Sequence, residues 1–89
     1  MVELGGSIKL EGFDSVDSGS LIIVKKIVGN YTKKVMNNNA DYKGLTISLN
    51  NSEAYEIKAE LMLGDKTHNS ESKGSNIFMA LNDVLSNLP

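Results

Sequence analysis

The residues of this sequence whose type and spacing indicate a possible function are lysines. The pairs Lys25-Lys26 and Lys33-Lys34 fall in one segment with no acidic residue between them, and Lys43 follows. In a helix, Lys26 and Lys33 project almost together, with Lys25 and Lys34 on either side. Because phosphates neutralised by lysine release counterions, a positive stripe of this kind suits nucleic-acid binding. These five lysines are therefore the candidate nucleic-acid-binding residues.

Groups for catalysis or metal binding are sparse. His68 is the sole histidine, and the chain has no cysteine. Asp65 and Glu71 are near His68 in sequence, but a strand directs Glu71 to the face opposite His68, so they complete no metal site or acid–base pair. The glycine-containing segments lack the spacing and the lysine of a phosphate-binding loop. We expect a protein that is not an enzyme and that has no metal, cofactor or small-molecule substrate.

Composition narrows the possible partners. The 89 residues are 40% hydrophobic and 22% charged, with a net charge of −2 and no arginine. This length suits one domain over residues 1–89, with residues 1–6 as a flexible N-terminus. The sequence contains neither a secretory signal nor an apolar run long enough to span a bilayer, so we expect a cytoplasmic protein without a membrane partner. Without arginine, planar bidentate clamps on phosphate cannot form, and a solvated helix surface remains an alternative reading of the lysines.

The first half of the chain predicts a strand and a long helix. Ile8–Glu11 alternates apolar and charged residues, as a half-buried strand does. Asp17 or Ser18 can cap a helix that begins near Gly19 or Ser20 and ends in the asparagines 37–39. We expect Gly29 to let this helix approach the sheet closely. The predicted core stripe is Leu21, Val24, Val28, Tyr31 and Val35.

The second half predicts two hairpins and a short helix. Strands over 45–49 and 54–63 are joined by polar turn residues, and a turn at 64–66 leads into a polar edge strand over 67–73. Asn76 or Ser75 can cap a final amphipathic helix. The outward positions of the sheet carry no aromatic residue for base stacking, and Tyr42, in a turn, is the one ring expected to be exposed.

The order strand, helix, three strands, helix predicts an α+β fold. A right-handed crossover makes the first two strands parallel neighbours, and the hairpins add antiparallel strands. The expected architecture is a two-layer β-α-β-β-β-α sandwich with a four-stranded mixed sheet and both helices on one face.

Three isoleucines suggest a second class of function. Ile22, Ile23 and Ile27 lie off the core stripe of the first helix, so its N-terminal half is apolar around most of its circumference. Either the second helix covers them or they form an interface with a second copy or another protein. The alternative to RNA binding is therefore a protein-interaction or homodimerisation module without nucleic-acid affinity.

The residues also resemble a family, the ribosome hibernation-promoting and translation-inhibiting factors of bacteria and plastids. The resemblance rests first on Leu10-Glu11-Gly12, Val16-Asp17 and Leu21, which look like the family's first strand, its glycine and the cap of its first helix. It rests further on a set that looks like the family's last turn, last strand and second helix: Gly64, His68, Ser70, Gly74 and residues 76–82.

The resemblance implies a cytoplasmic, non-enzymatic protein that regulates translation by binding the small ribosomal subunit or RNA through basic residues of its helices and loops. The sequence departs from the family pattern in three ways. Asn76 and Asn82 stand where the family usually has acids, arginine is absent, and the family's basic C-terminal extension has no counterpart in these residues. The absent arginines and the absent basic extension remove positive charge with which the family binds RNA, so they put in question whether this chain retains RNA binding.

Overall fold

The structure, a computed structural model, describes residues 2–4, 7–14, 16–50 and 54–88. In residues 2–4 it describes the backbone. The elements in chain order are β1 (Val2–Leu4), β2 (Ile8–Glu11), α1 (Ser18–Asn38), β3 (Tyr42–Asn50), β4 (Tyr55–Leu63), β5 (Lys66–Gly74) and α2 (Ile77–Ser86).

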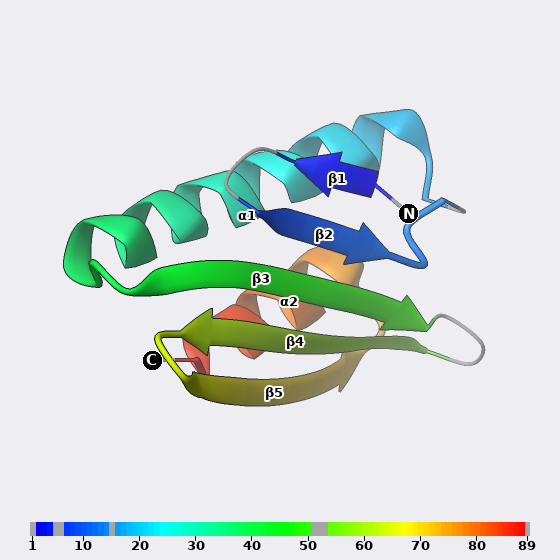
Figure 1. Cartoon of the computed structure of the whole chain (residues 1–89). Coiled ribbons are helices and arrows are strands. Elements are labelled where there is room, and N and C mark those ends of the chain that lie inside the picture. Colours follow the sequence, from blue (N-terminus) through cyan, green and yellow to red (C-terminus); the bar gives the residue numbers. More distant parts are fainter. Residues whose placement is uncertain (1, 5–6, 15, 51–53, 89) are drawn as a thin grey trace.

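The strands form one mixed sheet in the order β1-β2-β3-β4-β5. β2 and β3 are parallel and are joined through α1, whereas β3, β4 and β5 follow one another antiparallel (Figure 1). The four-stranded mixed sheet and the two helices of the predicted α+β sandwich are thus confirmed, and β1 is added at one edge. The described helices include none long and apolar enough to cross a bilayer.

The added strand replaces part of the predicted flexible N-terminus. Val2–Leu4 pair antiparallel with β2, from Val2 opposite Leu10 to Leu4 opposite Ile8. Ser7, at a positive φ of 61°, lies in the turn that leads into β2. A three-residue alternation is too short to be distinguished in sequence from a polar terminus, and here the pairing with β2 decides the structure. Met1, Gly5 and Gly6 lie outside the described residues.

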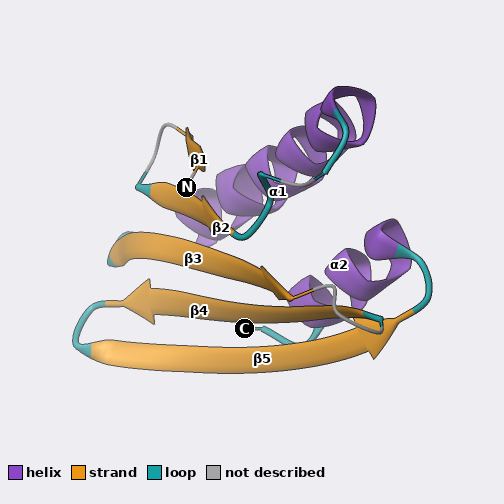
Figure 2. Cartoon of the chain, turned by 90° about the vertical axis from the view of Figure 1, so that its right-hand side faces the viewer, coloured by secondary structure: helices purple, strands orange, loops and turns teal. Residues whose placement is uncertain are grey.

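Both helices pack on the same face of the sheet (Figure 2). Residues that alternate along β2, β3 and β4 point into the core with the inner faces of α1 and α2. Among the side chains most fully removed from solvent are Phe13, Leu10, Leu45, Ile47, Ile57, Leu61, Leu81 and Val84. Burial of aliphatic and aromatic side chains at this interface is the main stabilising term for a domain of this size.

The predicted helix ends are confirmed. Asp17 is the N-cap of α1 and accepts a hydrogen bond from the backbone N–H of Ser20 at 3.0 Å. Asn39 is its C-cap. Asn76 caps α2 and accepts from the backbone N–H groups of Phe78 and Met79 at 2.8 and 3.2 Å.

Two local predictions are wrong. Tyr42 is not an exposed turn residue, because β3 begins there and the ring is half-buried against the core, opposite Leu63. Gly29 does not serve a close approach, because a Cβ built on it would meet no atom within 4 Å. Phe13 is a core residue and is 0% exposed, although it lies in a connection whose sequence has no periodicity that would predict its burial.

Candidate nucleic-acid interface

The lysines of α1 are placed differently around the helix. Lys26 and Lys33 are exposed on its outer surface, away from the buried Val24 and Val28. Lys25 is half-buried. α1 contains no acidic residue, so these side chains create an uninterrupted positive surface along the helix.

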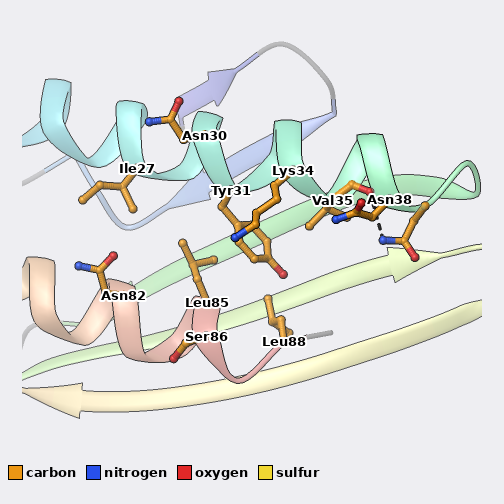
Figure 3. A pocket seen from close by; sticks show the side chains of 11 residues that line it. Ile27, Asn30, Tyr31, Lys34, Val35, Asn38, Asn82, Leu85, Ser86 and Leu88 are labelled. Atoms are coloured by element: carbon orange, nitrogen blue, oxygen red, sulfur yellow. Dashed lines mark hydrogen bonds between the residues drawn. The ribbon is translucent and has the colours of Figure 1, made fainter.

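Lys34 is turned toward the second helix. It lines a groove of about 690 Å³ between α1 and α2. The apolar part of the groove comes from Ile27, Tyr31 and Val35 of α1 and from Leu85 and Leu88 on the other side. Figure 3 shows Tyr31 and Lys34 extending from α1 toward α2.

Polar side chains surround this apolar floor. Asn30 and Asn38 of α1 and Asn82 of α2 are exposed and line the groove. Within the described part of the chain, none of these three amides makes a side-chain hydrogen bond, and no lining residue is acidic. The groove therefore offers unused donors and acceptors beside one cation.

Two further lining residues have defined partners. The Asn39 amide donates to the carbonyl of Val35 at 3.1 Å, and the Ser86 hydroxyl donates to the carbonyl of Asp83 at 3.0 Å. Burial raises the pKa of the Tyr31 hydroxyl above its ordinary value of 10.0, so this tyrosine is neutral at physiological pH. Lys34 is the one charged side chain among the described residues that line the groove.

Lys43 lies apart from the lysines of α1. It lines a hollow with Lys9, Thr46 and Met62, residues that the strand register places on the sheet face opposite the helices. The sheet therefore separates Lys43 from Lys26 and Lys33. A ligand on the outer surface of α1 does not reach Lys43 without passing the edge of the sheet.

The open face of the sheet has mixed charge. Lys58 lies 3.7 Å from Glu71, and Lys73 lies 3.3 Å from Glu56, across β4 and β5. Glu11 and Glu60 are also exposed on this face. Since these carboxylates would repel phosphate, the helix layer is the more favourable side for a nucleic acid.

The second helix does not cover the whole isoleucine cluster. Ile22 and Ile23 are 56% and 46% exposed, whereas Ile27 is half-buried and packs against the core. The N-terminal half of α1 thus presents two large apolar side chains to solvent next to its lysines.

His68 lies on the helix side of β5, opposite Leu61, and is half-buried. Glu71 is on the other face, opposite Lys58, as the alternation of the strand predicts. Within the described ranges, no cluster of three or more His, Asp or Glu side chains is arranged to hold a metal ion.

The groove could not be predicted from the sequence, because its walls come from two helices that are far apart in the chain. Asn30, Lys34 and Asn38 are spaced four apart and share one side of α1, which is a visible signal. Their opposite wall, however, comes from residues more than 40 positions further along the chain. No sequence periodicity links the two walls.

Of the comparisons with known proteins, the comparison of structures supports the fold described above. No protein-family model matches the chain, and no curated protein sequence matches it significantly. A solved structure described as a ribosomal subunit interface protein from Coxiella burnetii is similar over 90% of this chain and 84% of its own length, with a TM-score of 0.55 and 13% sequence identity. At this identity, the likeness establishes a shared fold.

Proposed function

We propose that this protein is a non-enzymatic, cytoplasmic binding protein that associates with the small ribosomal subunit, or with structured RNA, and thereby regulates translation. The observation that carries the proposal is the outer surface of α1, where Lys26 and Lys33 are exposed on a helix without acidic residues. The fold shared with a ribosomal subunit interface protein supports the choice of partner.

The contacts expected from this surface are electrostatic. Lys26 and Lys33 would contact phosphates directly, while the half-buried Lys25 and the groove residue Lys34 flank them. Lys43 would make a contact only where the RNA passes around the sheet edge. Without arginine, binding would depend on the arrangement of point charges rather than on bidentate clamps.

The test is sedimentation of the purified protein with bacterial small ribosomal subunits through sucrose gradients at low and high salt. Co-migration at low salt that disappears at high salt is expected, and Lys26→Glu/Lys33→Glu should abolish it. The matched control, Lys9→Glu/Lys66→Glu, makes the same change in net charge at exposed strand residues and should still co-migrate. Absence of the wild-type protein from the subunit fractions at low salt would refute the proposal.

The exposed isoleucines favour a second candidate, a homodimerisation or protein-interaction module. Ile22 and Ile23 would supply the centre of such an interface, with Ile27 at its margin. This function predicts a salt-insensitive dimer that Ile22→Ser/Ile23→Ser converts to a monomer. Analytical ultracentrifugation distinguishes the two candidates, since RNA association requires no dimer.

A further inference from the structure

The groove between α1 and α2 combines features that the lysine surface alone does not use. Its floor is apolar, the exposed amides of Asn30, Asn38 and Asn82 line it, and Lys34 is the one cation among the described residues that line it. Its size of about 690 Å³ falls in the range of roughly 300–1,000 Å³ usual for small-molecule sites. Figure 3 shows the side chains of the two helices facing one another across it.

We propose that this groove binds one unpaired nucleotide of the RNA, with the base between the helices and a neighbouring phosphate on Lys34. The proposal rests on the proposed function, which brings RNA to α1, and names what the adjoining groove would hold.

Each part of a nucleotide has a matching group in the groove. The flat, weakly polar face of a base suits the half-buried side chains of Tyr31 and Ile27, because unpaired bases stack on aromatic and apolar side chains. The base edge presents donors and acceptors, and the amides of Asn38 and Asn82, at the two ends of the groove, each supply both kinds of group, so a base edge can pair with one of them (Figure 3). These amides make no side-chain hydrogen bonds with the described residues, so a base displaces only water.

Charge favours an anionic ligand such as a nucleotide over a basic or neutral partner segment. None of the described residues that line the groove is acidic, and Lys34 supplies a positive charge at its margin. Lys33, the residue before Lys34 in α1, is exposed on the outer surface. A chain of phosphates that follows α1 therefore passes the mouth of the groove, where an unpaired base can turn inward.

The test is base-specific chemical probing of ribosomal RNA in small subunits saturated with the protein, using reagents that together report all four bases. Sedimentation first establishes that each variant is bound. The wild-type protein should protect an unpaired base, and Asn38→Ala/Asn82→Ala should restore its reactivity while the variant still co-sediments. Affinity should fall about tenfold, since bidentate amide–base contacts contribute on this scale.

The matched control is Asn37→Ala/Asn69→Ala, which removes two exposed amides that do not line the groove. It should protect the same base as the wild-type protein. Because all four asparagines are exposed, the substitutions leave the core intact, and thermal unfolding checks this.

The outcomes separate the two proposals. If the protein co-sediments but protects no unpaired base, or if the groove variant protects the same base as the control, the groove proposal is overturned while the lysine surface stands. If the wild-type protein does not bind the subunits, both fail. A dimer that buries the groove, lost in Asn82→Glu, would show that a second copy occupies it and would also overturn the proposal.

Discussion

Gly12 has a backbone conformation that favours glycine, and it lies directly against strand β3. Its φ is +78°, a region that L-residues rarely adopt, and a Cβ at this position would collide with the carbonyl oxygen of Leu49 in β3. Gly12→Ala should therefore destabilise the protein by about 2–3 kcal/mol, because strain and collision add. Urea denaturation followed by circular dichroism measures this change, and a loss below the error of the method would contradict the geometry.

Gly29 gives the opposite expectation within the same protein. It lies inside α1, and the space around it is open to a methyl group. Gly29→Ala should increase the free energy of unfolding by about 0.5–1 kcal/mol, because alanine loses less backbone entropy in a helix. The same denaturation experiment tests it, and a destabilised variant would mean that the glycine has a role in packing.

The helix cap formed by Asp17 makes the stability of the protein depend on pH. Hydrogen bonds from Ser20, chiefly from its backbone N–H, lower the pKa of the carboxyl group below its ordinary value of 3.8. Since the folded-state pKa is lowered, the stabilisation is complete above the unfolded-state value and is lost as pH falls through the folded-state value.

The melting temperature of Asp17→Ala should accordingly lie below that of the wild-type protein at pH 7, and the gap should narrow as the pH falls from about 5 to 2. Glu60→Ala serves as the comparison, because Glu60 is an exposed acid in the middle of β4 and caps no helix. A gap that stays constant across this range would show that the carboxylate charge does not contribute.

Helix α1 carries the residues of both candidate functions on its outer side, one set after the other along the helix. Ile22 and Ile23 are exposed near its start, and Lys26 and Lys33 follow on the outside. The helix is held by its inner residues against the sheet, so substitutions on the outer surface change binding more than stability.

For α1, RNA association should depend on salt in proportion to the lysines that contact phosphate. Each Lys→Ala substitution at Lys26 or Lys33 should reduce the steepness of the log–log salt dependence by about 0.9 on a duplex and about 0.7 on a single strand. Fluorescence anisotropy with a labelled RNA hairpin at several salt concentrations measures these slopes. An unchanged slope in both variants would place the phosphate contacts elsewhere, and Lys66→Ala provides the control.

For the whole molecule, the sheet separates two electrostatic surfaces. The helix layer carries the lysines of α1, while lysines and carboxylates are mixed on the open sheet face, where two pairs of them form salt bridges. The net charge of −2 therefore does not describe the side that an RNA would meet. The positive surface of α1 can orient an approaching polyanion even when the total charge is unfavourable.

Strong periodic elements could be predicted from sequence, whereas short or irregular ones could not. The alternation in 55–63 and the stripe of Val24, Val28 and Val35 predict β4 and α1, and the caps at Asp17 and Asn76 follow from their side-chain chemistry. Strand β1 and the burial of Phe13 depend on contacts with distant segments, which local periodicity does not register.

From the sequence alone, the α+β sandwich, the order of strands β2 to β5 and the positions of the lysines along α1 could be predicted, because hydrophobic periodicity and crossover handedness act locally or follow from chain order. Which lysines share a surface depends on the tertiary packing. Because α2 packs beside α1, Lys34 lines a groove between the two helices. Lys43 lies at the other face of the sheet, away from the helices. Residues far apart in the chain build these surfaces, so their geometry exists only once the layers have packed.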